Sequence, residues 1–334
     1  MPDLLTIDQL SVAFATDEGT VHAVDQVSFG LSAGETVGLV GESGCGKTVT
    51  AMSILRLIPR PPGRFAGGRI LFDGKDLLTL PLDELRAIRG QQISMIFQEP
   101  MTALSPLHRI GRQLVETLQL HQPIGKREAQ AKSQEWLTKV GIADAAERMY
   151  AYPFQLSGGM RQRVMIAMAL MLHPRLIIAD EPTTALDVTV QAQVFDLMRQ
   201  MKAADTALLL ITHDMGVIWD MCDRVVVMYA SRIAEIAPVK TLFRQPLHPY
   251  TQGLLAAVPR LRGEKQRLAA IPGQVPSPLN YPAGCHFHDR CPAAFARCKT
   301  EKPPLYLLPD GRQVACFLHE PKPTGSPDPM PGNH

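Results

Sequence analysis

The stretch Gly41-Glu42-Ser43-Gly44-Cys45-Gly46-Lys47-Thr48 decides the fold of this chain. Its spacing is that of a phosphate-binding loop, whose glycines let successive backbone N–H groups turn toward an anion. We expect Lys47 to reach the β- and γ-phosphates of ATP, and the Thr48 hydroxyl to coordinate Mg²⁺. The alternative is a chance glycine-rich turn, and the flanking sequence argues against it.

Apolar segments place this loop between a strand and a helix. Thr36–Val40 predicts a short buried strand, and Thr48–Leu57 predicts a helix whose positive N-terminal end faces the same anion. Val49 lies in the first turn of that helix, so we count it among the nucleotide-binding residues.

The rest of the chain predicts an α/β fold. Leu5–Phe14 and Ala23–Leu31 alternate in patches and are expected to form antiparallel strands, Pro59–Gly68 predicts a loop, and residues from about 102 to 172 predict a helical insertion. Strands alternating with helices indicate a mostly parallel sheet that is covered on both faces. Further buried strands are expected at Ile93–Phe97, Arg175–Ala179, Ala207–Thr212 and Arg224–Met228.

We divide the chain into three parts. Residues 1–250 are expected to form a nucleotide-binding domain, and residues 251–319 a small Cys-rich C-terminal extension. Residues 320–334 contain five prolines and few large apolar groups, so we expect a disordered tail there.

Composition narrows the classes of protein. The 334 residues carry a formal net charge of +2, which gives no electrostatic reason to expect nucleic acid as a partner. No apolar run approaches the roughly 18 residues that a membrane span needs, and the N-terminus lacks the pattern of a signal peptide. We therefore expect a soluble chain whose membrane role is peripheral.

Two acids, Asp180 and Glu181, end the apolar run Leu176–Ala179. Because neighbouring side chains of a strand point to opposite sides, the two acids should have different tasks. Asp180 is expected to bind Mg²⁺, directly or through water. Glu181 is expected to polarise the water that attacks the γ-phosphate, since a general base must lie within hydrogen-bond reach of that water. A solvated strand end is the plainer interpretation, but it explains one acid better than two.

Two further polar residues follow apolar strands. His213 comes after Ala207–Ile211 and could donate a hydrogen bond to the γ-phosphate. Gln98 comes after Ile93–Phe97 and could contact Mg²⁺ or the attacking water. A lone histidine or glutamine at a strand end is more often structural, so both predictions depend on the surrounding motifs.

A second candidate anion site is Leu156-Ser157-Gly158-Gly159-Met160-Arg161-Gln162, ahead of the helix-compatible run Arg163–Leu172. Ser-Gly-Gly at a helix start can bind an anion by the same physics as the first loop, although an ordinary serine cap is the simpler alternative. One phosphate-binding loop and two phosphate sites suggest that the second site serves the nucleotide of another subunit.

The order of these motifs, from about Leu4 to Pro249, resembles the ATP-binding subunits of ABC transporters. The resemblance implies a P-loop NTPase cassette with an antiparallel β edge and a helical subdomain, which pairs head to tail and hydrolyses ATP. It also implies individual roles. Phe14 would stack on adenine, Gln98 would couple to the membrane subunit, and His213 would be the switch histidine.

The same resemblance assigns residues to the interface between the two ATPase subunits. Ser157 and Gly159 would contact the γ-phosphate of ATP bound by the facing subunit. Ala185-Leu186-Asp187 would form a loop that lines the dimer interface.

The final segment opens with His248-Pro249-Tyr250-Thr251, which resembles the start of an extension in dipeptide, oligopeptide and nickel importers. Gln98–Pro106 also looks like that subfamily, with Glu99, Ala103 and Ser105 replacing its usual Asp, Ser and Asn. The resemblance implies a second, paralogous ATPase subunit, two membrane permease subunits and an extracytoplasmic peptide-binding protein. It places the chain at the cytoplasmic face of the inner membrane.

The cargo stays open at this point. Peptides are favoured by resemblance, and nickel or another small solute is the alternative. A soluble ABC ATPase, a P-loop kinase and a non-hydrolysing metal-responsive subunit are further alternatives that fit the motifs less well.

Cys285, Cys291, Cys298 and Cys316 lie in the extension, separated by five, six and seventeen residues. Four thiols in a short Pro-rich segment suggest metal ligation, at a spacing unlike the two-residue interval of common zinc ribbons. The resemblance favours a [4Fe–4S] cluster, with zinc or four free buried thiols as alternatives. For Cys45, in the phosphate-binding loop, the hypothesis is that a thiol reagent attached there blocks ATP binding.

Overall fold

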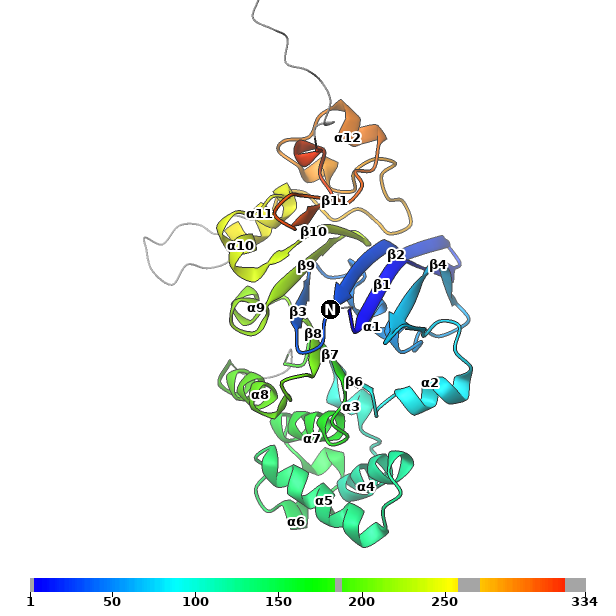
Figure 1. Cartoon of the computed structure of the whole chain (residues 1–334), viewed down its shortest axis with the longest axis vertical. Helices are drawn as coiled ribbons and strands as arrows, with labels where there is room; N and C mark the ends of the chain where they lie inside the picture. Colours follow the sequence, from blue (N-terminus) through cyan, green and yellow to red (C-terminus); the bar gives the residue numbers. More distant parts are fainter. Residues whose placement is uncertain (1–2, 184–187, 258–270, 322–334) are drawn as a thin grey trace, which may run out of the picture.

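The structure is a computed structural model that describes residues 3–183, 188–257 and 271–321. These residues form two sheets (Figure 1). The larger sheet has eight strands in the order β11-β12-β10-β9-β3-β8-β7-β6. Its strands are β3 Thr36–Val40, β6 Ile93–Ile96, β7 Leu176–Asp180, β8 Ala207–Ile211, β9 Arg224–Tyr229, β10 Arg232–Pro238, β11 Tyr306–Leu307 and β12 Gln313–Val314.

The centre of the larger sheet is parallel. β3 pairs with β8 and β9, β8 pairs with β7, and β7 pairs with β6. Every residue of β3, β6, β7 and β8 is buried, as expected for strands covered on both faces. Because these strands run in one direction, their carboxyl ends meet at one edge of the sheet, where ligands of such sheets bind.

The smaller sheet is antiparallel and has the order β2-β1-β4-β5. Its strands are β1 Leu5–Thr16, β2 Gly19–Leu31, β4 Gly63–Phe72 and β5 Lys75–Asp76. The expected antiparallel pair at the N-terminus is confirmed. The loop expected over Pro59–Gly68 is wrong in part, because the chain from Gly63 onward pairs with β1 and places Gly63 opposite Phe14. The hydrogen-bonding edge of β1 overrides the weak strand propensity of this Gly-containing segment.

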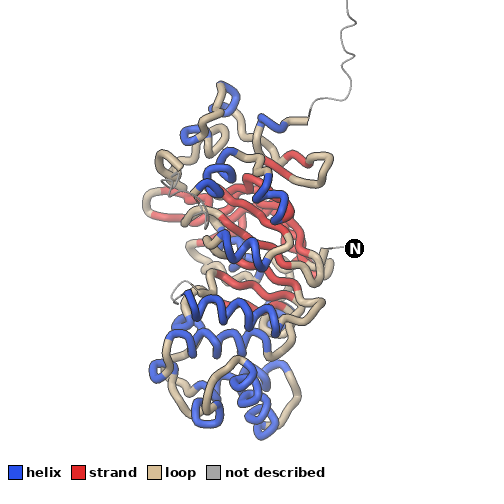
Figure 2. The backbone as a smooth tube through the Cα atoms, turned by 90° about the vertical axis from the view of Figure 1, so that its left-hand side faces the viewer, coloured by secondary structure: helices blue, strands red, loops and turns tan. Residues whose placement is uncertain are grey.

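Helices cover the sheets and build one end of the molecule. α4 and α5 pack against each other, and with α6 and α7 they lie beyond β6, at the lower end of Figures 1 and 2. No helix among the described residues is long and apolar enough to cross a membrane. The helices are α1 Lys47–Ile54, α2 Leu82–Ile88, α3 Pro100–Ala103, α4 Ile110–His121, α5 Lys126–Lys139, α6 Ala145–Arg148, α7 Gly158–Leu170, α8 Val188–Met201, α9 Met215–Met221, α10 Val239–Arg244, α11 Pro249–Ala256 and α12 Ala296–Thr300.

The C-terminal segment lies at the opposite end and continues the larger sheet. β12 pairs antiparallel with β10, placing Val314 opposite Glu235, and β11 pairs with β12. Tyr250 and Phe287 are buried in one apolar cluster with residues of β9 and β10. The described part of the C-terminal segment therefore shares a core with the sheet that carries the phosphate-binding loop.

Candidate active site

The phosphate-binding loop joins β3 to α1 and needs glycine at its ends. Gly41 has φ 154° and Gly46 has φ 103°, values that other residues rarely adopt. A Cβ atom on Gly41 would lie 2.1 Å from the carbonyl oxygen of Met228, and one on Gly46 would lie 2.3 Å from that of Ala23. The close approach of neighbouring strands thus fixes the path of the loop.

Lys47 is buried and folds back over the loop. Its Nζ donates hydrogen bonds of 2.8 Å to the carbonyl oxygen of Gly41 and 3.1 Å to that of Glu42. The ammonium group lies inside a curl of backbone that includes Ser43 and Gly44. It can therefore exchange its hydrogen bonds to these carbonyls for bonds to phosphate oxygens.

The side chain of Cys45 is almost fully buried in the same loop. Burial raises the pKa of its thiol, which the nearby charge of Lys47 offsets only in part. Because the thiolate is the reactive form, this environment predicts slow modification of Cys45, and the hypothesis that a thiol reagent attached there blocks ATP binding stays a prediction.

Thr48 and Asp180 meet beside the loop. The Thr48 hydroxyl donates a hydrogen bond of 3.2 Å to Oδ1 of Asp180, which ends β7 and is 2% exposed. Burial, together with the charge of Glu181, raises the pKa of Asp180, and the bond from Thr48 opposes that shift. A hydroxyl and a carboxylate at one point are oxygen ligands of the kind Mg²⁺ prefers, so the two residues fit the predicted magnesium site.

Glu181 lies between Gln98 and His213. Its Oε2 accepts a hydrogen bond of 3.2 Å from Nε2 of Gln98 and lies 3.7 Å from Nδ1 of His213. The three residues follow β6, β7 and β8, which are neighbours in the sheet, so the parallel topology brings them together. The side chain of Glu181 is 19% exposed and that of His213 is 68% exposed, leaving one face of this group open to a ligand.

The backbone of Glu181 is itself unusual. Its φ of 44° is in the left-handed region, and its N–H donates a hydrogen bond of 2.9 Å to the carbonyl oxygen of Ile211 at the end of β8. A glutamate held in that conformation by a neighbouring strand is a strained position of the kind that gathers at functional sites.

Ser157, Gly158 and Gly159 begin α7. The Ser157 hydroxyl accepts a hydrogen bond of 3.3 Å from the N–H of Met160, so it caps its own helix. A Cβ atom on Gly158 would meet open space, whereas one on Gly159 would lie 3.2 Å from Cγ1 of Val190. The Ser-Gly-Gly turn is thus a capped helix start with one side unobstructed.

Two predicted residues stand apart from this group. Phe14 lies in β1 and is partly buried against the core, opposite Val21 and Gly63. Asp187, predicted with its neighbours for a dimer interface, lies outside the described residues.

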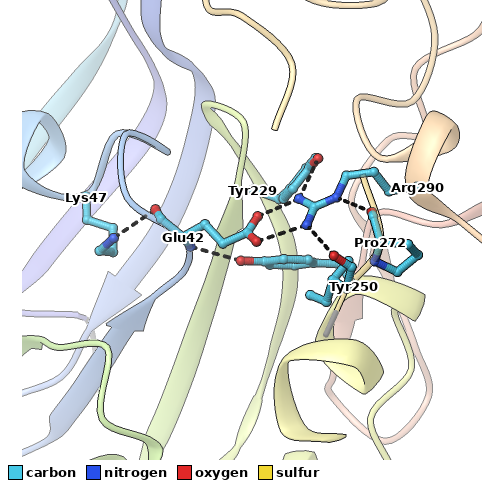
Figure 3. Close-up of polar contacts among 7 residues, drawn as sticks. Glu42, Lys47, Tyr229, Tyr250, Pro272 and Arg290 are labelled. Atoms are coloured by element: carbon cyan, nitrogen blue, oxygen red, sulfur yellow. Dashed lines mark hydrogen bonds and ion pairs between the residues drawn. The ribbon is translucent and has the colours of Figure 1, made fainter. Parts of the chain in front are cut away.

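Two residues that the sequence analysis did not assign to the site contact the phosphate-binding loop. Arg290 forms an ion pair with the Glu42 carboxylate, and the Tyr250 hydroxyl accepts a hydrogen bond from the Glu42 N–H (Figure 3). Arg290 is 248 positions from Glu42, and no local pattern indicates such a contact.

The four predicted ligand cysteines of the extension line one small cavity, together with His248 and Phe317. All four are free thiols. Burial raises the pKa of Cys285 to about 11 and raises those of Cys291 and Cys316, with repulsion among the thiols adding to the effect. Within the described residues, no group of three or more His, Cys, Asp or Glu side chains has the arrangement of a metal site.

Comparison with known proteins links both parts of the chain to transport. The family described as ABC transporter matches residues 24–184, and the family described as oligopeptide/dipeptide transporter, C-terminal region, matches residues 234–298. A solved dimeric structure of the ATP-binding cassette MJ0796 bound to ADP and Pi has 25% sequence identity and a TM-score of 0.63, covering 70% of this chain and 98% of that one.

Curated relatives match along nearly the whole chain. The oligopeptide transport ATP-binding protein AppD of Bacillus subtilis is 49% identical over 96% of this chain and 98% of its own length. OppD, which has the same description in Salmonella typhimurium, is 50% identical over 94% of this chain and 93% of its own. The dipeptide transport ATP-binding protein DppD of Bacillus subtilis is 48% identical over 96% of both. With its phosphate-binding loop and strand-end residues gathered at one sheet edge, this chain belongs to the ATP-binding proteins of ABC-type oligopeptide and dipeptide transporters.

Proposed function

We propose that this chain is an ATP-hydrolysing subunit that powers the import of dipeptides or oligopeptides across the cytoplasmic membrane. The observation that carries the proposal is the grouping of Gln98, Glu181 and His213 at adjacent strand ends, next to the Thr48–Asp180 pair. The peptide cargo is inferred from the relatives, which are named for oligopeptide and dipeptide transport.

Hydrolysis proceeds by positioning and electrostatics on an in-line attack of water. The loop from Gly41 to Val49 holds the phosphates, with Lys47 on the β- and γ-phosphates. Three residues would hold Mg²⁺ when it is bound, namely Thr48, Asp180 and Gln98. Glu181 orients and polarises the attacking water, and His213 senses the γ-phosphate.

A second ATPase subunit, a paralogue of this one, completes the site. Ser157, Gly158 and Gly159 contact the nucleotide of the facing subunit, Asp187 lines the interface, and Phe14 stacks on adenine. The dimeric cassette that resembles this fold supports such pairing. Two permease subunits and an extracytoplasmic peptide-binding protein complete the transporter, with this chain peripheral on the cytoplasmic face of the inner membrane.

The chain is divided into three regions. Residues 1–250 form the nucleotide-binding domain, with a helical subdomain at about 102–172, and residues 251–319 form the Cys-rich extension. Residues 320–334 were predicted to be a disordered tail, and most of them lie outside the described residues.

The decisive experiment is reconstitution of the whole transporter. We would co-purify this chain with its membrane partners, identify them by mass spectrometry, and place the complex in vesicles with the binding protein. Labelled di- and tripeptides should accumulate in an ATP-dependent manner, and each should stimulate phosphate release. ATP-dependent uptake of Ni²⁺ with no uptake of peptide would overturn the peptide assignment and leave the ATPase assignment standing.

We also propose that Cys285, Cys291, Cys298 and Cys316 hold a [4Fe–4S] cluster, with zinc as the alternative. Support comes from the donor chemistry, since four thiols line one cavity and cysteine thiolates are the ligands of such clusters. When bound, the cluster would hold together a segment too small for its own core. Anaerobic purification followed by iron, sulfide and zinc analysis tests the assignment, and protein free of all three contradicts it.

A further inference from the structure

Glu42, the second residue of the phosphate-binding loop, is gripped by a side chain from the extension (Figure 3). Arg290 donates through Nη1 to Oε2 of Glu42 at 2.7 Å and through Nη2 to Oε1 at 3.1 Å. Such paired bonds between a guanidinium and a carboxylate are short, charge-assisted and geometrically specific. The contact therefore fixes the direction of the Glu42 side chain.

The guanidinium of Arg290 is itself immobilised. Its side chain is 5% exposed, and its Nε donates to the carbonyl oxygen of Pro272 at 2.9 Å. Its Nη2 donates to the carbonyl oxygen of Ile271 and its Nη1 to the hydroxyl of Tyr229 in β9, both at 3.3 Å. Because the extension and the central sheet hold the same group, Glu42 meets a fixed partner rather than a mobile surface arginine.

The backbone of Glu42 is held as well. Its N–H donates to the hydroxyl of Tyr250 at 2.9 Å, and its carbonyl oxygen accepts from Nζ of Lys47 at 3.1 Å. The backbone of Glu42 is thus bonded both to Tyr250 and to Lys47, the lysine expected to bind phosphate.

The ion pair also changes the net charge of the phosphate-binding loop. The Glu42 side chain is 28% exposed and sits in a loop whose ligand is a polyanion. Two like charges a few ångströms apart near a protein surface repel each other strongly enough to weaken the binding of an anion. Arg290 cancels the carboxylate at the point where the negative charge would otherwise oppose the phosphates.

We propose that Arg290 is a positioning residue of the nucleotide site, which neutralises Glu42 and holds the loop in its binding conformation. The extension is then a working part of the ATP site. The inference depends on nucleotide binding by the loop and is independent of the transported cargo.

The test uses the full-length chain and a fluorescent ATP analogue, displaced by ATP under conditions without turnover. We expect Arg290→Gln to weaken ATP binding by about tenfold, in the range of ordinary coupling between sites. Adding Glu42→Gln should restore the affinity to within about threefold of the parent, since the uncompensated charge is then gone. In the assembled transporter, Arg290→Gln should raise KM for ATP more than it lowers kcat.

Arg297→Gln is the matched control. Arg297 lies in the same extension and pairs with Glu301 and Glu320, so its loss should leave ATP affinity within twofold, a difference of about 0.4 kcal/mol. Unchanged ATP affinity in Arg290→Gln overturns the proposal. A double variant as weak as Arg290→Gln overturns it too, because the loss of affinity then does not come from the uncompensated charge of Glu42.

Thermal unfolding of the same variants covers the case in which Arg290→Gln does not fold. A double variant with Glu42→Gln that folds and binds ATP supports the proposal, because removal of the carboxylate then suffices to restore the protein. A double variant that folds no better than the single one overturns it.

Discussion

The side-chain amide of Gln98 donates a hydrogen bond of 3.2 Å to Oε2 of Glu181, although the two residues are 83 positions apart in the sequence. The bond joins the loop after β6 to the end of β7. Any displacement of the segment that begins at Gln98 therefore acts on the carboxylate expected to handle the attacking water. The pair therefore connects the segment that leads into the helical end of the molecule with the expected site of hydrolysis.

The first prediction concerns Glu181→Gln. The amide keeps the size of the side chain but cannot accept a proton, so phosphate release by the assembled complex should fall by at least about 100-fold. ATP affinity should stay within a few-fold, because the loop is untouched. Glu147→Gln, which alters an exposed acid of α6, is the control and should leave turnover unchanged. Normal turnover in Glu181→Gln would remove this residue from the reaction.

The second prediction concerns Asp180→Asn and magnesium. Loss of the carboxylate beside Thr48 should raise the Mg²⁺ concentration for half-maximal hydrolysis by about tenfold or more, since carboxylates are the stronger ligands of this hard cation. Binding of ATP in the absence of Mg²⁺ should weaken little. A metal titration of parent and variant measures the shift, and superimposable titrations would place Mg²⁺ elsewhere.

The third prediction separates the roles of Ser157 within the chain and across the interface. Ser157→Ala removes the cap of α7 and should lower the free energy of unfolding by about 1 kcal/mol. ATP affinity of the isolated chain should not change, whereas hydrolysis by the assembled complex should fall at least about tenfold. Ser157→Thr, which retains a capping hydroxyl, is the control for stability. Equal hydrolysis by Ser157→Ala and parent would reduce this serine to a helix cap.

The fourth prediction is a pH dependence from His248. Burial lowers its pKa to about 4, with a contribution from the charge of His319, and its Nδ1 accepts a hydrogen bond of 3.0 Å from the N–H of Tyr250. The unfolded chain, with a histidine pKa of about 6.5, takes up a proton that the folded chain excludes. Stability contributed at neutral pH is therefore lost as pH falls from about 6.5 toward 4, by about 1 kcal/mol between pH 6 and pH 5.

Urea unfolding across that pH range measures the effect. His248→Asn keeps a capping acceptor that does not titrate, so its stability should fall less steeply than that of the parent. His286, whose pKa burial also lowers to about 4, should keep part of the slope in the variant. The exposed His22, changed to Asn, is the control and should leave the slope unaltered. Parallel curves for His248→Asn and the parent would contradict the prediction.

Residues at strand ends could be predicted because their signal is local. An apolar run ends at or just before each of three residues, Asp180, Glu181 and His213. Parallel pairing of those runs is enough to bring the three residues to one edge of the sheet. The contact between Arg290 and Glu42 has no such signal. It arises from packing between segments 248 positions apart, which no periodicity in the sequence records.

The error at Pro59–Gly68 has a related cause. Judged alone, its prolines and glycines indicate a loop, whereas the open edge of β1 supplies partners that make Gly63–Phe72 a strand. Tertiary pairing decides the state of segments whose own propensity is weak. The four thiols of the extension were within reach of prediction, because their number in a short segment indicates a shared site, and they do line one cavity.

The short pairing of β12 with β10 has a consequence for synthesis of the protein. Residues 313–314 supply the partner of β10, so a nascent or prematurely terminated copy that ends before them leaves the β10 edge unpaired. An open edge of this kind recruits other strands and promotes aggregation. Copies that end before residue 313 should therefore aggregate more readily than the full-length chain.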